Sequence, residues 1–414
     1  MRVLDTHVLI LGAGPAGVSA ALFLAKNNIS CVLVDKEKFP RDKICGDAIS
    51  GKVVSVLKKI DPLLLERLSN STIQLGSFGI SFIAPNSKSL RIPFRKAHKD
   101  LNKAPCFISK RVDFDNFLIE EVRAKRQIEF IENCELRDSQ KNNNGYSFHS
   151  KDGEIRINTK LVIVCDGNKS SFAKKTNNFS ISNEENCFGL RAYYENVGGL
   201  DEDNFIELHF IKDLLPGYFW IFPLPNGQVN IGLGMRADFI TKRNLKLPQL
   251  LDKVLALPQF RDRFKEARQI NGINLCSLPM GTKKRVLHGD NFLLCGDAAA
   301  LIDPFTGEGI GNAMQSGMIA AHFAEKAIQE NDYSSSKLRF YDTEIYKKLG
   351  PELKMSTNLQ RLLMYPWLFN FVVNKATKNI ELKKIISTMF EDVDLRTKFK
   401  DPKFYFKLLF NLKK

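Results

Sequence analysis

The chain begins with a long uncharged stretch, from Val8 to Ala25, which reads V-L-I-L-G-A-G-P-A-G-V-S-A-A-L-F-L-A. Eighteen such residues are about enough to cross a membrane. However, glycine and proline interrupt the run, which starts almost at the first residue and ends in no A-x-A cleavage site. Val8 to Leu11 is typical of a strand buried on both faces, and Pro15 to Lys26 is typical of a helix packed against it. The pattern therefore predicts a strand, a turn and a helix rather than a membrane span or a signal peptide.

The turn between this strand and helix carries three glycines at the spacing of a dinucleotide fingerprint. Gly12 permits the tight turn, Gly14 lets the backbone approach a pyrophosphate, and Gly17 lets the helix lie close to the strand. The helix N-terminus adds N–H donors and the positive end of its dipole. A second strand, Cys31 to Val34, ends at Asp35, where a carboxylate can accept a hydrogen bond from a ribose hydroxyl or simply be a solvated strand end. We expect cofactor contacts from Gly12, Gly14, Ala16, Gly17, Asp35 and Lys36.

Later segments return to the same fold after interruptions. Short strand-like segments follow residue 75, and the pattern from about 181 to 280 is mostly strand-like, as in an antiparallel sheet. Between these segments, Arg111 to Lys125 has an amphipathic helical pattern. Buried strands then lead into Asp166 and into Gly296-Asp297, and an alanine-rich helix starts near Glu308. We predict an α/β fold with a Rossmann-like domain that binds a dinucleotide cofactor (residues 1–75, 96–180 and 285–335), an interleaved antiparallel-sheet substrate domain (76–95 and 181–284) and a helical, basic and aromatic C-terminal cap (336–414).

The composition favours an enzyme that meets an anionic surface. The 61 basic and 46 acidic residues give a formal charge of +15, which suits a membrane face, a phosphorylated substrate, an acidic carrier or nucleic acid. No motif for binding nucleic acid accompanies this charge, so we expect none as a partner. The eight cysteines and six histidines are scattered, without a C-x-x-C pair or zinc spacing. We therefore expect no metal and a reducing, cytoplasmic setting.

Four motifs, taken in order, resemble the flavoprotein monooxygenase superfamily. They are the N-terminal fingerprint, Arg111-Val112-Asp113-Phe114-Asp115, Cys165-Asp166-Gly167 and Gly296-Asp297. The resemblance implies FAD as cofactor, with Arg111 near the flavin or its pyrophosphate, Asp166 beside the first helix and Asp297 on the ribityl or nearby sugar hydroxyls. The alternative for Arg111 is that it only braces its own helix.

The stretch from Asp303 to Gly311 contains three glycines just before the alanine-rich helix. Exposed N–H groups at a helix N-terminus bind anions. In a flavoenzyme these anions are the pyrophosphate and the reduced isoalloxazine ring, so such donors would favour reduction of the flavin. The cofactor-binding residues expected from this half of the chain are Arg111, Asp166, Gly296, Asp297, Gly307, Gly309, Ile310 and Gly311.

Two further motifs resemble the geranylgeranyl reductases. Lys43 to Asp47 (K-I-C-G-D) matches their Cys-Gly element, and Pro216 to Pro223 matches their Y-x-W-x-F-P signature, which Q-V-N-I-G-L-G at Gln228 to Gly234 extends. The resemblance implies reduction of C=C bonds in a polyprenyl lipid or other long hydrophobic substrate, by hydride transfer from flavin N5 and protonation of the other carbon. We expect catalytic roles for Cys45, Tyr218 and Trp220. Cys45 could instead be a small residue packed in a tight loop, and the two aromatic residues could fill a core.

Other functions use the same scaffold. A monooxygenase or halogenase would act on an aromatic or carrier-bound substrate through a C4a-hydroperoxide, although halogenases carry W-x-W-x-I-P where this chain has Tyr218 and Phe222. A flavin-bound sensor or assembly partner would show no turnover. The chain has no second glycine fingerprint between a strand and a helix, so NAD(P)H or another electron donor, including a donor protein, would bind only transiently.

The C-terminal region combines aromatic and basic residues. Leu362 to Val373 includes Tyr365, Trp367, Phe369 and Phe371, and many lysines follow. Twelve residues with a proline inside cannot span a bilayer but suit an interfacial segment. The alternatives are a peripheral contact at the inner membrane face or a helical cap that packs over the substrate domain.

Overall fold

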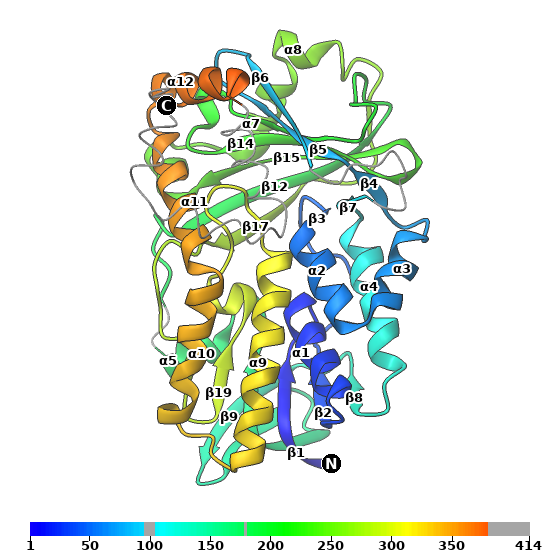
Figure 1. Ribbon diagram of the computed structural model, residues 1–414, viewed down its shortest axis with the longest axis vertical. Coiled ribbons are helices and arrows are strands. Elements are labelled where there is room, and N and C mark those ends of the chain that lie inside the picture. The colour runs from blue at the N-terminus through cyan, green and yellow to red at the C-terminus, as the bar shows by residue number, and fades with distance from the viewer. Residues whose placement is uncertain (95–103, 178–179, 380–414) are drawn as a thin grey trace, which may run out of the picture.

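The computed structural model describes residues 1–94, 104–177 and 180–379 (Figure 1). Two large sheets lie one above the other in this view, and long helices run beside the lower one. Strands within residues 2–164 build most of the lower sheet, which two short strands within residues 288–294 complete, and residues that follow about position 180 build most of the upper sheet.

The lower sheet is mostly parallel and forms from apolar runs that need cover on both faces. Its order is β18-β19-β11-β1-β2-β8, and the hairpin β9-β10 extends β11. Residues 161–164 of β11 and the end of β1, from Val8, are buried, as expected for inner parallel strands. The strands are β1 (Arg2–Leu11), β2 (Cys31–Val34), β8 (Ile128–Ile131), β9 (Leu136–Asn142), β10 (Gly145–Ser150), β11 (Ile155–Val164), β18 (His288–Gly289) and β19 (Phe292–Leu294).

The parallel pairing brings the carboxyl ends of four strands to one edge. The amide of Gly12 donates to the carbonyl of Val34, that of Cys165 to Leu11, and that of Cys295 to Val164, at 2.7 to 2.9 Å. In open α/β sheets ligands bind at this edge. Three segments far apart in sequence, each with a predicted cofactor residue, therefore meet there.

Two helices pack closely beside these strand ends. Helix α1 (Pro15–Lys26) crosses α9 (Ile310–Glu330) so closely that a Cβ on Gly317 would lie 2.1 Å from the carbonyl oxygen of Ala16. The hydroxyl of Ser19 also donates to the carbonyl of Met314 at 2.7 Å. The remaining helices around the sheet are α2 (Gly51–Ile60), α3 (Pro62–Ser69), α4 (Arg111–Arg123), α5 (Ser171–Asn177) and α10 (Ser335–Lys348).

The upper sheet is largely antiparallel and has two different faces. Its order is β16-β12-β15-β14-β13-β5-β6, with β17 also paired to β12. On β14, Phe219 and Ile221 pack beneath the helices around α7 (Leu247–Leu255), whereas Trp220 and Phe222 face the lower domain. The strands are β5 (Gly79–Ile83), β6 (Ser89–Pro93), β12 (Asn186–Glu195), β13 (Ile206–His209), β14 (Tyr218–Pro223), β15 (Gln228–Arg236), β16 (Arg268–Gln269) and β17 (Asn274–Pro279).

Two local expectations were inaccurate. Residues 76–83 do not form one strand, because β4 (Leu75–Ser77) joins β3 (Ala48–Ile49) and β7 (Cys106–Ile108) in a small third sheet. The stretch from 181 to 280 also contains helices, since residues such as Leu250, Leu251 and Val254 recur at helical spacing: α6 (Ala237–Lys242), α7 (Leu247–Leu255) and α8 (Pro258–Arg261). Helix α9 begins at Ile310, close to the expected start near Glu308, and the carboxylate of Glu308 accepts from the amide of Gly311.

The C-terminal region is helical as far as the structure describes it. Helix α11 (Gly350–Leu362) is followed by α12 (Pro366–Lys378), and Pro366 starts the second helix. The final part of the predicted cap, residues 380–414, lies outside the described residues. Among the residues described, no helix is both long and apolar enough to cross a membrane.

The contact between α1 and α9 gives a direct test of this packing. We expect Gly317→Ala to lower the free energy of unfolding by about 1–3 kcal/mol, because the new methyl group would overlap the backbone of Ala16. Gly350→Ala, in the first turn of α11, is the matched control, since its Cβ would meet nothing nearer than 3.6 Å. Chemical denaturation of both variants measures the difference, and equal stability would contradict the packing described here.

Candidate active site

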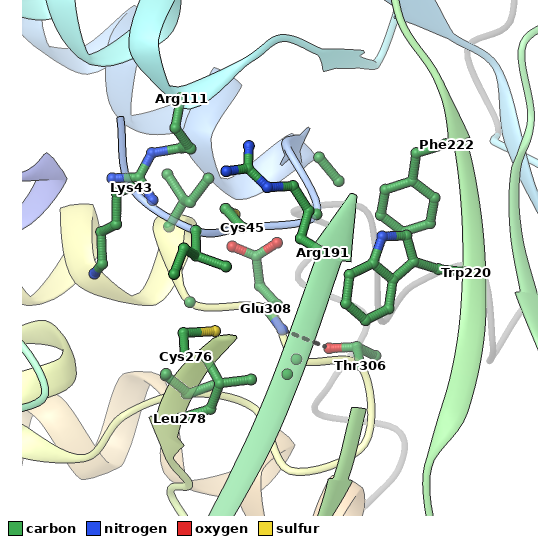
Figure 2. A pocket seen from close by; sticks show the side chains of 18 of the residues that line it. Lys43, Cys45, Arg111, Arg191, Trp220, Phe222, Cys276, Leu278, Thr306 and Glu308 are labelled. Carbon is green, nitrogen blue, oxygen red and sulfur yellow. Dashed lines mark hydrogen bonds between the residues drawn. The ribbon is translucent and has the colours of Figure 1, made fainter. Parts of the chain in front are cut away.

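A cavity of about 600 Å³ lies between the two large sheets (Figure 2). We call it the central cavity. Its wall includes the N-terminal ends of α1 and α9, the loop from Asp42 to Ser50, and side chains of β12, β13 and β14. Of the expected site residues, these contribute to the lining: Lys36, Cys45, Arg111, Tyr218, Trp220, Asp297, Gly307, Gly309 and Ile310.

The glycine turn is shaped for a close backbone approach. Gly12 has φ +95°, and a Cβ there would lie 2.4 Å from the carbonyl oxygen of Cys165. A Cβ on Gly17 would lie 1.9 Å from the carbonyl oxygen of Gly12, so helix and turn could not approach with any larger residue. Gly14 is the N-cap residue of α1, and no described side chain makes a capping hydrogen bond at this end of the helix. The turn therefore fits the pyrophosphate of a dinucleotide.

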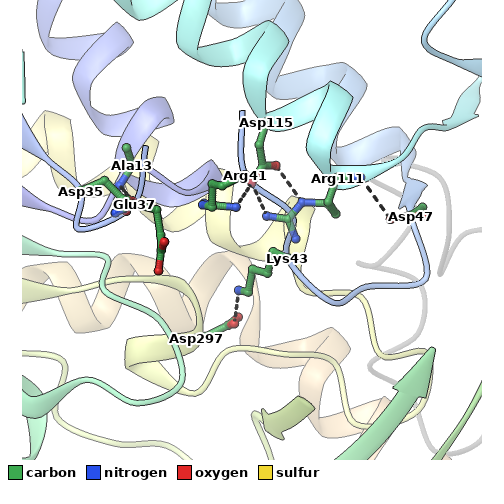
Figure 3. Close-up of polar contacts among 9 residues, drawn as sticks. All are labelled: Ala13, Asp35, Glu37, Arg41, Lys43, Asp47, Arg111, Asp115 and Asp297. Carbon is green, nitrogen blue, oxygen red and sulfur yellow. Dashed lines mark hydrogen bonds and ion pairs between the residues drawn. The ribbon is translucent and has the colours of Figure 1, made fainter. Parts of the chain in front are cut away.

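Asp35 holds this turn rather than pointing freely outward. Its carboxylate accepts from the amide of Ala13 at 2.7 Å and from that of Glu37 at 2.9 Å, as Figure 3 shows. The ribose contact expected for Asp35 stays a prediction. Asp166 and Gly296 follow neighbouring strands, beside the turn, and Ala16 faces α9 through its carbonyl.

A positively charged cluster of three side chains lies next to the glycine turn. Arg111 binds Asp115 through two hydrogen bonds of 2.7 Å, and Arg41 donates to the same carboxylate at 2.7 Å (Figure 3). Although burial opposes it, Arg111 and Arg41 lower the pKa of Asp115, so the three side chains carry a net charge of +1. A Cβ on Gly14 would lie 3.7 Å from Nη2 of Arg41. Arg111 thus braces its helix and also lines the cavity, and Arg41 was not among the residues expected from the sequence.

The start of α9 lies across the cavity from the glycine turn. We call the end of the cavity between them the cofactor end. Gly307 has φ +73°, and a Cβ there would lie 3.0 Å from the hydroxyl of Tyr218. That hydroxyl donates to the carbonyl of Thr306 at 2.6 Å, which fixes the turn. Asp297 pairs with Lys43 at 2.7 Å. Gly311 is not brought to the cavity wall, and its amide is taken by Glu308.

A buried hydrogen-bond network ties the Cys45 loop to the upper sheet. Nε1 of Trp220 donates to Oδ1 of Asn230 at 2.8 Å. The Asn230 amide nitrogen donates to the carbonyl of Cys45 at 2.8 Å and to Asp47 at 2.7 Å. The hydroxyl of Tyr193 donates to the same Asp47 oxygen at 2.7 Å. The Y-x-W-x-F-P strand therefore positions the loop, and we missed Tyr193, Asp47 and Asn230 although the quoted motifs contain the last two.

Burial alters the acidity of two groups in this loop. Desolvation raises the pKa of Asp47 to about 6, although hydrogen bonds from Tyr193 and Asn230 work against the rise. Desolvation also raises the pKa of the Cys45 thiol, so Cys45 is protonated at neutral pH. The loop hence presents a thiol with its proton, not a thiolate.

The other end of the cavity is apolar. Its wall consists of side chains from the small sheet and from the lower face of β13 and β14, among them Phe107, Ile108, Ile206, Leu208, Trp220 and Phe222. The Phe222 ring lies so close to the loop that a Cβ on Gly46 would be 3.0 Å from it. Among the described residues no three His, Cys, Asp or Glu side chains gather as metal ligands.

Comparisons with known proteins agree with this geometry. Residues 5–196 match the family model described as an FAD binding domain. Digeranylgeranylglycerophospholipid reductase 1 of Methanosphaera stadtmanae is 29% identical over 404 residues, which are 94% of each chain. Menaquinone reductase of Mycobacterium tuberculosis is 26% identical over 87% of this chain and 85% of its own.

Two solved structures share the fold. A geranylgeranyl bacteriochlorophyll reductase-like protein from Thermoplasma acidophilum superposes with a TM-score of 0.80, at 22% identity, over 97% of this chain and 100% of its own. A flavin-dependent brominase gives a TM-score of 0.76 at 19% identity, over 93% of each chain. The chain is therefore an FAD-dependent oxidoreductase. Within that class it is similar, over most of its length, to a digeranylgeranylglycerophospholipid reductase and a menaquinone reductase.

The raised pKa of Asp47 has a measurable consequence for stability. The folded protein holds this proton up to about pH 6, whereas an unfolded Asp releases it near pH 3.8. The contribution of Asp47 to the free energy of unfolding is therefore full below about pH 4 and is lost as the pH rises to about 6, by up to about 3 kcal/mol. Denaturation with saturating FAD should show wild type losing stability relative to Asp47→Asn across this range.

The control for that series is Asp262→Asn, whose carboxylate is 88% exposed. The stability of wild type relative to Asp47→Asn should change more between pH 4 and 7 than its stability relative to this control. A constant difference for Asp47→Asn would mean that Asp47 titrates normally.

Proposed function

We propose that this enzyme reduces C=C double bonds in the polyprenyl chain of a lipid. The observation that carries the proposal is the continuity of the central cavity, which joins Pro15 at the start of α1 and the turn at Gly307 and Gly309 to an apolar wall around Trp220 and Phe222. An alkene chain has no polar group for a site to grip, so a long apolar cavity beside the cofactor is what its reduction requires. The names of the curated relatives support this substrate class.

FAD, when bound, supplies the hydride for this chemistry. We assign its pyrophosphate to the turn at Gly12 and Gly14, beside Arg41 and Arg111, because donors and net positive charge meet there. Lys36, Asp297, Gly307, Gly309 and Ile310 are proposed contacts for the rest of the cofactor.

The protein positions the substrate, keeps water away from the reacting bond and supplies a proton. Tyr218 fixes the turn before α9, and Trp220 fixes Asn230, which holds the Cys45 carbonyl. We propose the Cys45 thiol as the proton donor to the second alkene carbon, since it lines the cavity and burial keeps it protonated. The apolar wall excludes water from the bond being reduced.

A second candidate, oxygen-dependent hydroxylation or halogenation, has the fold likeness to a brominase in its favour. It is the weaker one, since Tyr218 and Phe222 replace the halogenase residues and since the relatives matched over most of the chain are reductases by name. NAD(P)H or a donor protein remains our proposal for the source of electrons. We also keep the three-part domain division, with residues 380–414 outside the described structure.

Anaerobic single turnover separates the two candidates. The flavin is reduced without oxygen and mixed with a geranylgeranylated lipid, and we expect the oxidised flavin spectrum to return as the lipid gains two hydrogens per bond. Leu208→Phe should slow this step at least about 10-fold by filling the apolar end, while Leu208→Met, which conserves volume, should not. Reoxidation that waits for air would favour the oxygen-dependent reaction.

We further propose that the enzyme takes its lipid from the cytoplasmic face of a membrane. The turn and helix at residues 364–371 expose Met364, Tyr365, Trp367 and Phe371 by 39% to 70%. Lys375 lies over the ring of Phe371 at 5.7 Å, so a cation accompanies the aromatic residues. Aromatic and basic side chains together suit a bilayer interface. We call these four residues the aromatic patch.

Vesicle binding tests the aromatic patch. Replacing Trp367 and Phe371 together by Ala should weaken binding to vesicles that contain anionic lipid by roughly 10-fold or more. Phe340→Ala is the matched control, because Phe340 is 51% exposed but lies on α10. Equal binding by wild type and the double variant in flotation assays would overturn the membrane proposal.

A further inference from the structure

Arg191 is a buried cation in the wall of the central cavity. It projects from β12 and is 1% exposed, and Figure 2 shows its guanidinium among the cavity side chains. Nη2 donates to Asp42 at 2.6 Å, and the guanidinium carbon lies 4.1 Å from the centre of the Tyr193 ring. Its Nε and Nη1 atoms have no hydrogen-bond partner in the described part of the chain.

These bare donors set Arg191 apart from Arg111 and Lys43, two other cations that line the cavity. Arg111 donates two hydrogen bonds to Asp115, and Lys43 is paired with Asp297. Asp42 accepts a hydrogen bond from only one nitrogen of Arg191, Nη2. Its own side chain is 45% exposed, so it neutralises the buried charge only in part. Burial works against the charge, but the hydrogen bond to Asp42 raises the pKa of Arg191, and the group stays cationic.

A purely structural ion pair does not account for this arrangement. A guanidinium has five N–H donors, and three of them belong to the two atoms without a partner. A buried donor without an acceptor is costly, and more so on a charged group. An anionic acceptor inside the cavity would relieve that cost, and oxygen atoms of a phosphate are the acceptors that a guanidinium binds best.

We propose that Arg191 binds a phosphate group carried by the substrate, so that the enzyme selects phosphorylated prenyl compounds over uncharged ones. The inference rests on the proposed function and deepens it. The apolar wall takes the chain, and Arg191, in the same cavity, takes the phosphate end. A phospholipid and an uncharged quinone, both found in the names of the relatives, differ in this property.

The test compares ligands that share one C20 chain. Binding of geranylgeranyl monophosphate and of geranylgeraniol to the FAD-loaded enzyme is followed by the perturbation of the flavin spectrum. We expect the phosphate ester to bind about 10- to 100-fold more tightly than the alcohol. Inorganic phosphate should compete only at much higher concentration, because it lacks the chain, and this distinguishes a lipid headgroup from free phosphate.

Two variants of the same ion pair separate recognition from structure. Arg191→Gln should abolish the preference for the ester, whereas Asp42→Asn, which leaves the guanidinium in place, should keep or increase it. The affinity for FAD should be the same in Arg191→Gln as in wild type. A structural pair would make both variants behave alike in every assay.

Three results would overturn the proposal, and they are distinguishable. Equal binding of ester and alcohol, or a preference that persists in Arg191→Gln, removes the phosphate site and leaves prenyl reduction standing. Loss of FAD from Arg191→Gln assigns the guanidinium to the cofactor. Failure of both prenyl ligands to bind or to reoxidise the flavin removes the proposed function itself.

Discussion

The buried amide of Asn230 is the interaction on which the site depends. It accepts from Trp220, donates to the backbone of Cys45 and donates to Asp47, all within 2.8 Å. One side chain thereby fixes the upper sheet against the loop that carries the thiol. Because Asn230, Trp220 and Asp47 are buried, loss of one partner would leave the others unsatisfied, which costs about 1–3 kcal/mol per group. The loop therefore has one position, and the cavity keeps its shape.

Charge is arranged differently at the two ends of this cavity. At the cofactor end, Arg41 and Arg111 share the single carboxylate of Asp115, which leaves net positive charge beside a helix N-terminus. At the other end the wall is apolar, and Trp220 and Phe222 come from alternate positions on one strand. Such a division suits an anionic cofactor that meets a hydrophobic substrate. The cationic end offers the cofactor compensating charge, and the apolar end offers the substrate an apolar environment.

The parallel strands and the glycine turn could be predicted from the sequence, because each depends on residues that lie close together along the chain. Gly12, Gly14 and Gly17 lie within six residues, and the apolar runs of β1, β11 and β19 are continuous. The hydrogen bonds of Asn230 could not be predicted in this way, because Asn230 and Asp47 are 183 residues apart and meet only after the sheets assemble. The same holds for Arg191 and Asp42, which are 149 residues apart. Aromatic alternation at Tyr218 to Phe222 indicated a strand but not that Trp220 would hold a loop.

The most direct measurement is a crystal structure of the enzyme with both FAD and a geranylgeranyl lipid bound. We expect the flavin ring between the Cys45 loop and the turn at Gly307 to Gly309, with an alkene bond of the chain against it and the chain along Leu208, Trp220 and Phe222. A chain bound elsewhere on the protein, with the apolar end of the cavity filled by the flavin or left to water, would contradict a function in prenyl reduction.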